Sequence, residues 1–335
     1  MTIEELKGLM TELGEKPFRA KQIYSWLHEH LVTSYDQMEN IPKSLRQKLE
    51  QYPITVLETL DVQISKMDGT RKYLFRLSDG NMIESVLMKY KHGNSVCISS
   101  QAGCRMGCRF CATGRQGLQH SLSTNEILNQ IESLPERERL TNVVFMGMGE
   151  PLDNLDSLLP ALEVLTSAWG FGWSPTRITV STAGVASRLE RFLEATQVHL
   201  AVSLHNPFPH ERAEIMPIEK AWPIREVVEI LRRYDFTHQR RVSFEYIVMS
   251  GLNDSPRHIR ELCRLLDGIK CRINLIRFHK IPGSPYFSPD DRAMIAFRDA
   301  LTAKGIHTTI RTSRGEDIQA ACGLLSTAQN EAAQF

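Results

Sequence analysis

The sequence has no run of about 20 apolar residues, the length that a membrane-spanning helix needs. No signal-peptide pattern opens it, and seven cysteines in 335 residues are few for a disulfide-stabilised secreted protein. Positive and negative charges nearly cancel, at a formal net charge of +1, so any contact with nucleic acid would have to come from local basic clusters. We therefore expect a cytoplasmic protein without membrane contact.

The sequence also lacks the glycine-rich dinucleotide-binding motif that can follow the first strand of an α/β fold. A loop with three cysteines stands there instead: Cys104, Cys108 and Cys111, in the pattern CxxxCxxC. A 4Fe-4S cluster normally takes four thiolate ligands, so three would leave one iron with an open position. An open position usually distinguishes a catalytic metal centre from a structural one. The spacing predicts an iron–sulfur centre that binds a small molecule and reacts with it.

Zinc, unligated thiols and disulfides compete with a cluster as interpretations of this loop. A structural zinc ion needs a fourth ligand, and the histidines near the loop do not stand at the usual zinc-finger spacing. Buried cysteines without a ligand are a weak interpretation, because a loop with glycine and arginine lacks the pattern of an apolar core. Disulfides are disfavoured by the reducing cytosol that we expect. A cluster is the best interpretation, with zinc as the alternative.

The length allows one large domain, or one with a small appendage. Helical periodicity predicts three helices near the N-terminus, over residues 6–13, 19–31 and 42–49. Basic clusters at residues 16–21 and 43–48 are typical of a solvated surface, with RNA contact as the alternative. Alternating apolar residues then predict two or three antiparallel strands, at residues 62–64, 73–77 and 82–86.

The rest of the chain alternates between predicted strands and amphipathic helices. The strands are residues 95–100, 142–146, 177–182, 198–204, 241–248 and 272–278, with a further one at 307–311. The helices include residues 124–134, 155–168, 224–234, 256–266 and 290–304. This order, with apolar and β-branched strands, predicts an α/β fold with a parallel sheet covered by helices. Both an open doubly wound sheet and a partial barrel fit the pattern.

Ligands of both architectures bind beyond the carboxyl ends of the parallel strands. Polar or ligand-type residues follow five of these strands: the cysteine loop, then Gly149 and Glu150, Ser181 and Thr182, Ser203 to His205, and His279. Each alone could have an ordinary structural role, for example as a helix cap. Together they predict one site at the mouth of the sheet.

The order of these motifs resembles the radical S-adenosylmethionine (SAM) superfamily, with a CxxxCxxC loop after the first strand and a Gly-Glu-Pro turn after the second. Longer stretches resemble one branch of it, the RlmN family. They are residues 99–104, 111–114, 147–152, 203–205 and 314–323. The similarity extends over essentially the whole chain, including residues 16–23 near the N-terminus.

The resemblance implies a partial (β/α)6 TIM-like radical SAM barrel in residues 91–335. It implies a helical RNA-recognition domain at residues 1–54 and a short antiparallel β extension at residues 55–90. Cys104, Cys108 and Cys111 would hold one 4Fe-4S cluster, whose open iron chelates SAM. The SAM site would comprise Gly149, Glu150, Ser181, Ser203, Leu204, His205 and His279, and each turnover would use two SAM molecules.

The activity that the resemblance implies is methylation of adenine carbon 2, in 23S ribosomal RNA at the peptidyl transferase centre and in transfer RNA next to the anticodon. That carbon is not nucleophilic, so direct displacement on SAM cannot methylate it. By the resemblance, Cys322 accepts a methyl group from one SAM, and a 5′-deoxyadenosyl radical from a second SAM activates that group for addition to the base. Glu84 matches the proton acceptor. Cys97 matches the resolving cysteine, which attacks the Cys322 sulfur and leaves a transient disulfide.

The sequence departs from the family pattern at two positions. His279 stands where many relatives have asparagine, and either side chain can hydrogen-bond SAM. Leu324 replaces the usual glutamine after Cys322 and Gly323, which removes a polar contact near the methyl carrier. Cys263 and Cys271 match no motif, and we expect them to be packed structural residues.

Two rival functions stay open at this point. A paralogue that methylates adenine carbon 8 and confers antibiotic resistance shares all the cysteines assigned above. A cluster- or zinc-stabilised RNA-binding module without turnover is the non-enzymatic alternative. The expected partners are 23S ribosomal RNA, transfer RNA, and an electron donor such as flavodoxin with its reductase. We expect a monomer.

Overall fold

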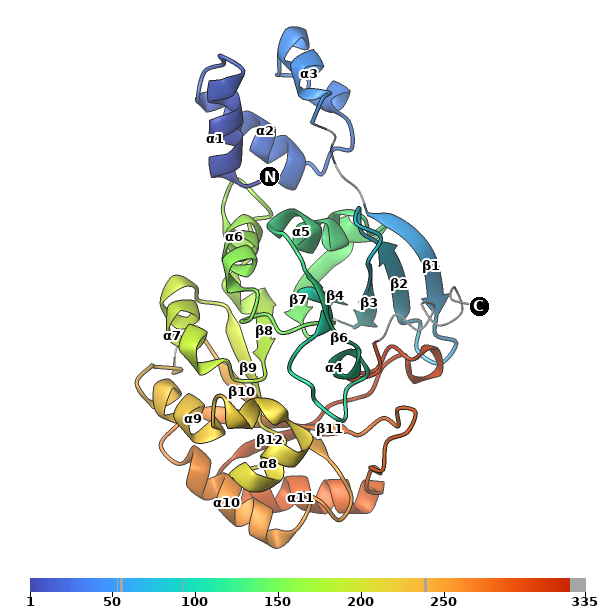
Figure 1. Cartoon of the computed structure of the whole chain (residues 1–335), viewed down its shortest axis with the longest axis vertical. Helices are drawn as coiled ribbons and strands as arrows, with labels where there is room; N and C mark the ends of the chain where they lie inside the picture. The colour runs from blue at the N-terminus through green and yellow to red at the C-terminus, as the bar shows by residue number, and fades with distance from the viewer. Residues whose placement is uncertain (53, 55–56, 92, 238–239, 326–335) are drawn as a thin grey trace.

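The structure is a computed structural model that describes residues 1–52, 54, 57–91, 93–237 and 240–325. Its first helices lie at the top of Figure 1 and follow the predicted periodicity: α1 (Ile3–Glu12), α2 (Phe18–His28) and α3 (Lys43–Leu49). Thr2 and Glu5 form a capping box at the start of α1, which satisfies two of the backbone N–H groups there. The apolar faces of the three helices are buried against one another and against the core.

This helical unit stands on two helices of the main body, α5 (Thr124–Glu132) and α6 (Leu155–Thr166). The Tyr24 hydroxyl lies 3.3 Å from the Ser167 hydroxyl, just after α6. His28 Nδ1 lies 2.9 Å from a carboxylate oxygen of Glu132, at the end of α5. Both contacts join residues far apart in the sequence, so they fix the helical unit against the body.

An antiparallel ribbon begins the sheet, as the alternating pattern predicts. It comprises β1 (Glu58–Ile64), β2 (Arg71–Arg76) and β3 (Met82–Tyr90), each paired with the next. β3 also pairs in antiparallel fashion with β4 (Gly93–Cys97), so the ribbon is continuous with the main sheet.

From β4 onward all pairings in the main sheet are parallel, and each strand lies beside its neighbour in the sequence. The further strands are β7 (Leu140–Phe145), β8 (Ile178–Thr182), β9 (His199–Ser203), β10 (Val242–Val248), β11 (Cys271–Arg277) and β12 (His307–Ile310). A doubly wound sheet would reverse its strand order at a switch point. The strand order does not reverse within the described residues, so the fold is the partial barrel of the two alternatives.

Helices cover the outer face of this barrel and contact one another in sequence order. After α5 and α6 they are α7 (Ala186–Ala195), α9 (Ile224–Arg232), α10 (Pro256–Leu266) and α11 (Asp291–Ala303), and the short α8 (Pro209–Ile215) follows β9. Short 3-10 helices occupy Tyr35–Gln37, Arg137–Arg139, Pro175–Arg177, Pro217–Lys220 and Glu316–Ile318. The concave inner face stays available for a site.

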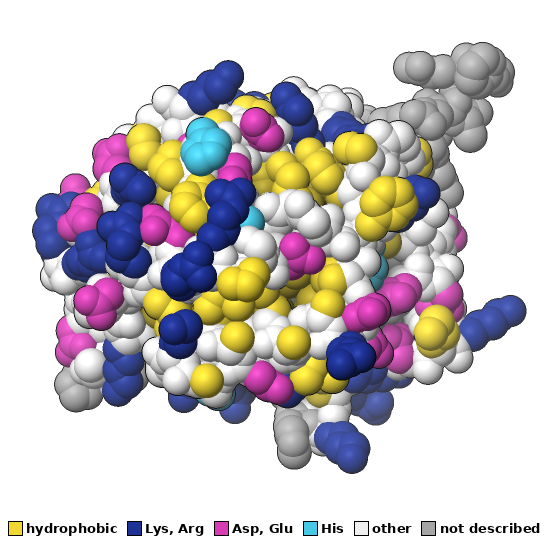
Figure 2. Space-filling model, turned by 90° about the horizontal axis from the view of Figure 1, so that it is seen from below, with side chains coloured by type: hydrophobic (Ala, Val, Ile, Leu, Met, Phe, Trp, Pro, Cys, Tyr) yellow, Lys and Arg dark blue, Asp and Glu magenta, His cyan; other side chains and the backbone are white. Residues whose placement is uncertain are grey.

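The surface carries mixed charge. On the face shown in Figure 2, Lys and Arg side chains are interspersed with Asp and Glu around hydrophobic side chains, in keeping with the net charge of +1. Of the helices that the structure describes, none combines the length and the apolar character that crossing a bilayer demands.

Candidate active site

The cysteine loop forms a small hairpin with a helix at its tip. β5 (Gln101–Cys104) pairs antiparallel with β6 (Gly117–Ser121), and α4 (Ala112–Gln116) lies between them. Gly103 has a φ of +73°, and a Cβ there would lie 1.9 Å from the Gly117 carbonyl oxygen. Glycine is therefore required at this position, because the two strands approach too closely for any side chain.

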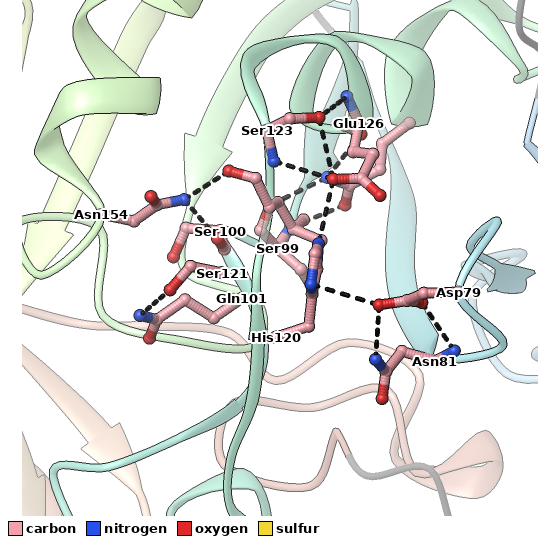
Figure 3. A network of polar contacts seen from close by, with 12 residues as sticks. Asp79, Asn81, Ser99, Ser100, Gln101, His120, Ser121, Ser123, Glu126 and Asn154 are labelled. Carbon is pink, nitrogen blue, oxygen red and sulfur yellow. Dashed lines mark hydrogen bonds and ion pairs between the residues drawn. The ribbon is translucent and has the colours of Figure 1, made fainter.

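Polar contacts hold the base of this hairpin from three sides (Figure 3). His120 on β6 lies 3.2 Å from Asp79, in the β2–β3 turn, and 3.1 Å from Glu126, at the start of α5. Asn154, before α6, donates to the backbone carbonyls of Ser100 and Leu122, at 2.9 and 2.7 Å. The loop that carries the cysteines is thus tied to three separate elements of the fold.

The inner face of the barrel contains a cavity, which we call the main cavity, with about 840 Å³ of empty space that includes its open mouth. It lies at the carboxyl ends of the parallel strands. Most of the predicted site residues line it together: Cys104, Cys108, Cys111, Gly149, Glu150, Ser181, Ser203, His205 and Cys322. The ends of several parallel strands and the cysteine hairpin therefore meet at one cavity.

Glu150 is buried at the end of β7 and accepts three hydrogen bonds. Its carboxylate receives the Thr182 hydroxyl and the Ala183 N–H, both at 2.7 Å, and the Leu152 N–H at 3.0 Å. Burial raises the pKa of Glu150 to about 7, although these donors oppose the shift. A cationic ligand in the cavity would favour the ionised carboxylate.

His205 has a φ of +55°, an uncommon backbone conformation for a residue other than glycine. Its Nδ1 accepts the Ile247 N–H at 3.0 Å, and its backbone carbonyl accepts the Asn253 side-chain amide at 2.7 Å. Burial lowers the pKa of His205 to about 3, so the ring is neutral near pH 7. Strained residues with such support are frequent at functional sites.

Arg212, on α8, is fully buried below the main cavity. It forms an ion pair with Glu219 and donates to the carbonyls of Ala183 and Ser203, both at 2.8 Å, and of Leu204 at 3.0 Å. One guanidinium therefore fixes the carboxyl ends of β8 and β9, the strands that carry Ser181 and Ser203. Sequence reasoning missed Arg212, because nothing in its local pattern distinguishes it from a surface arginine.

Three thiols converge on one part of the main cavity. Burial raises the pKa of Cys104 to about 12, and it raises the pKa of Cys108 and of Cys111, with the neighbouring thiols adding to the effect. Among the described residues, no three His, Cys, Asp or Glu side chains lie close enough to hold a single metal ion. The three thiols that line this cavity match the ligand type of a 4Fe-4S cluster.

Cys322 lines the main cavity, and Cys97, at the end of β4, lies near Cys322 outside that lining. Burial raises the pKa of Cys97 to about 12, and the adjacent Cys322 adds to the shift. Arg311 follows β12, and interaction with Cys322 is the main cause that raises its pKa. It donates to the Met146 sulfur at 3.1 Å and lies 3.5 Å from Glu245. Arg311 is the last residue of the strand predicted at 307–311. The rule that ligands bind beyond strand ends could therefore have identified it.

The segment around Cys322 rests directly on the cysteine hairpin. The Ala112 N–H donates to the Gly323 carbonyl at 2.8 Å, and the Thr113 hydroxyl donates to the Leu325 carbonyl at 2.7 Å. Both donors belong to α4, which begins directly after Cys111.

Four predicted residues lie outside the lining of the main cavity: Cys97 at the end of β4, described above, and Glu84, Leu204 and His279. Glu84 is buried on β3, 3.0 Å from Lys72 Nζ. Its neighbour Ser85 bonds Gln130 of α5, so Glu84 faces the opposite side of the sheet, away from that helix. Leu204 is fully buried between Ser203 and His205. His279 lines a smaller neighbouring pocket, where its Nε2 lies 3.1 Å from the Ser313 hydroxyl.

Comparison with known proteins agrees with this geometry. The family model of the radical SAM superfamily matches residues 98–266, about half of the chain, and the N-terminal domain model of ribosomal RNA large subunit methyltransferases matches residues 1–54. The crystal structure of a radical SAM methyltransferase from Sphaerobacter thermophilus is 39% identical, covers 97% of both chains and has a TM-score of 0.90. The fold and the site thus define a radical SAM enzyme, a class that binds a 4Fe-4S cluster and SAM.

Relatives that match over nearly the full length of the chain identify the family within the radical SAM class. A Bacteroides fragilis protein named probable dual-specificity RNA methyltransferase RlmN is 52% identical over 99% of this chain and 96% of its own length. A Porphyromonas gingivalis protein of the same name is 53% identical over 100% of this chain and 98% of its own. The chain belongs to the RlmN family of SAM-dependent RNA methyltransferases.

Proposed function

We propose that this enzyme methylates carbon 2 of a specific adenosine in both 23S ribosomal RNA and transfer RNA. The Bacteroides and Porphyromonas relatives carry the dual-specificity name over essentially the whole chain, which supports two RNA substrates. The observation that carries the proposal is the position of Cys322. It lines the cavity with the three hairpin thiols, and Cys97 lies beside it.

The hairpin cysteines, Cys104, Cys108 and Cys111, would hold the cluster, because their three thiols share one wall of the cavity. When bound there, the cluster and SAM supply a methyl group and a one-electron route to a carbon radical, which an unactivated adenine carbon requires. The residues proposed to contact SAM are Gly149, Glu150, Ser181, Ser203, Leu204, His205 and His279. Of these, Glu150 offers a carboxylate for the amino group of SAM, while the hydroxyls of Ser181 and Ser203 offer further hydrogen bonds.

Three side chains would carry the methyl transfer. The Cys322 sulfur accepts the methyl group and holds the carbon while it bonds to the base. Glu84 takes the proton that leaves the base carbon, from its place on the sheet face opposite α5. The unpaired electron of the adduct would pass to the bound cluster. The Cys97 thiolate then attacks the Cys322 sulfur, so that a disulfide forms and the carbon–sulfur bond to the RNA breaks; the electron pair of that bond stays on the carbon, which a proton from water converts into the methyl group.

The domain organisation and the electron donor complete the proposal. Residues 1–54 would form an RNA-recognition domain, residues 55–90 a β extension and residues 91–335 the catalytic domain, in support of which the N-terminal family model ends at residue 54. A flavodoxin with its reductase would supply electrons to a monomeric enzyme. We expect the enzyme to act in the cytoplasm, which its proposed RNA substrates support.

Two cysteine variants and one control test this function. Cys322→Ala should abolish methylation, whereas Cys97→Ala should accumulate a covalent complex of protein and RNA that is visible on a denaturing gel. Cys263→Ala, on helix α10, removes a thiol of the same chain remote from these roles and should behave as the wild type. Normal turnover by Cys97→Ala would refute the resolving role. Mass spectrometry of digested RNA distinguishes 2-methyladenosine from the carbon-8 product of the rival paralogue.

A further inference from the structure

A second, smaller pocket adjoins the main cavity at Cys322. This outer pocket has about 380 Å³ of empty space, including its mouth. The two pockets share Ile276, Arg311 and Cys322. The outer pocket also contains Tyr90 at the end of β3 and Arg314 in the segment after β12, which is drawn in red below β1–β3 in Figure 1. The side chain of Cys322 therefore lies at the junction of the main cavity and the outer pocket.

The segment that forms one wall of the outer pocket is held in place by the β1–β2 turn. The Gly315 N–H donates to Asp68 at 3.1 Å, and Asp317 accepts the Ser65 hydroxyl at 2.7 Å. Gly315 has a φ of +60°, and a Cβ there would lie 2.8 Å from the Ala320 Cβ. The wall is thus a defined surface rather than a loose loop.

Tyr90 and Arg314 give this wall an unusual pair of groups. The Tyr90 ring is 44% exposed, and the Arg314 guanidinium carbon lies 5.0 Å from the ring centroid. Asp68 is the one carboxylate near Arg314 among the described residues, and it is 3.8 Å away. The Arg314 Nε–H is buried and has no acceptor within the described part of the chain. The Arg314 side chain as a whole is 25% exposed and lines the pocket, so its outer nitrogens can donate to a ligand there.

We propose that the outer pocket receives the target adenine, with Tyr90 as its stacking surface and Arg314 as a hydrogen-bond donor to its ring nitrogens or ribose. Proteins hold unstacked RNA bases on aromatic rings and on guanidinium planes, and both groups are present here. A base that receives a carbon from Cys322 must also contact that sulfur, and the outer pocket ends on it. The proposal rests on the proposed function, and it gives Tyr90 and Arg314 a positioning role.

The position of the target base in the outer pocket can be measured by fluorescence, independently of methylation. We would place 8-vinyladenosine, a fluorescent adenosine analogue whose carbon 2 is unsubstituted, at the target position of an RNA hairpin that the wild-type enzyme methylates. Stacking quenches this fluorophore, so binding to the cluster-loaded enzyme should quench it beyond the level in free single-stranded RNA. Tyr90→Ala should relieve the quench and lower kcat/KM by about 5- to 150-fold, the range for loss of one base–aromatic stack. Tyr90→Phe retains the ring and should restore the quench.

Phe287 provides a matched control, because it is an exposed aromatic ring, 62% exposed, with Lys280 over its face and outside both pockets. Phe287→Ala should leave quench and kcat/KM at wild-type values. Arg314→Met should weaken RNA binding and also relieve the quench. If it weakens binding with the quench unchanged, Arg314 contacts a phosphate and the assignment to the base is overturned.

Equal quenching by wild type and Tyr90→Ala would likewise overturn the proposal, while methylation by the wild type would leave the proposed function intact. Conversely, a wild-type enzyme that methylates no adenosine would refute the proposed function. The quench comparison would still report whether a purine occupies the outer pocket.

Discussion

Removing the buried guanidinium of Arg212 should destabilise the mouth of the active site. In Arg212→Met, Glu219 keeps the Ile224 N–H as a partner at 2.9 Å but loses its counter-charge, and three carbonyl groups lose their donor. Breaking a buried ion pair from one side typically costs about 3–5 kcal/mol, because the remaining charge stays buried. We expect the free energy of unfolding to fall by about that amount, measured by urea denaturation under anaerobic conditions.

Two companion variants make the Arg212 result interpretable. Arg260→Met changes an exposed arginine on α10 and should alter stability by less than about 0.5 kcal/mol. Arg212→Met combined with Glu219→Gln removes the stranded charge and should recover part of the loss. SAM affinity, measured by equilibrium dialysis, should fall in the single variant because the turns after β8 and β9 lose their common anchor. A loss below about 1 kcal/mol in Arg212→Met would refute the reasoning.

Three further perturbations follow from the site. Because burial raises the pKa of Glu150 to about 7, SAM affinity should fall as pH drops through about 7, and Glu150→Gln should flatten this profile. The free energy of unfolding of the SAM-free protein should change in the opposite direction and fall as pH rises from about 4.5 to about 7. In this range Glu150 has lost its proton in the unfolded chain but keeps it in the native state. Gly103→Ala should prevent cluster loading, measured as iron per chain, whereas Gly69→Ala, with a similar φ but open space, should load normally. His120→Ala should leave global unfolding nearly unchanged but speed amide exchange in β5–β6.

The sequence was most informative where the pattern is local. Strand and helix positions followed from periodicity, and the strand-end rule brought Glu150, Ser181 and His205 to the same cavity as the cysteines. The choice between a doubly wound sheet and a partial barrel was different, because it depends on which strands pair. Pairing order is a long-range property that local propensity does not encode.

Contacts between distant segments account for what the sequence could not predict. Arg212 acts through carbonyl groups of two strand ends, and backbone carbonyls leave no trace in a sequence pattern. Tyr90 and Arg314 are 224 positions apart along the chain by their numbering, yet they form one wall. Glu84 was assigned by resemblance alone, and its pairing with Lys72 follows from the register of a hairpin.

The contacts between α4 and the segment around Cys322 have a consequence for biogenesis. Two hydrogen bonds from the helix that begins after Cys111 fasten the segment that bears Cys322, the proposed methyl acceptor. A cluster must enter at the same hairpin, so we expect the iron and sulfide to be inserted before this segment docks on α4. Newly made chains would acquire their cluster first and the docked Cys322 thiol second.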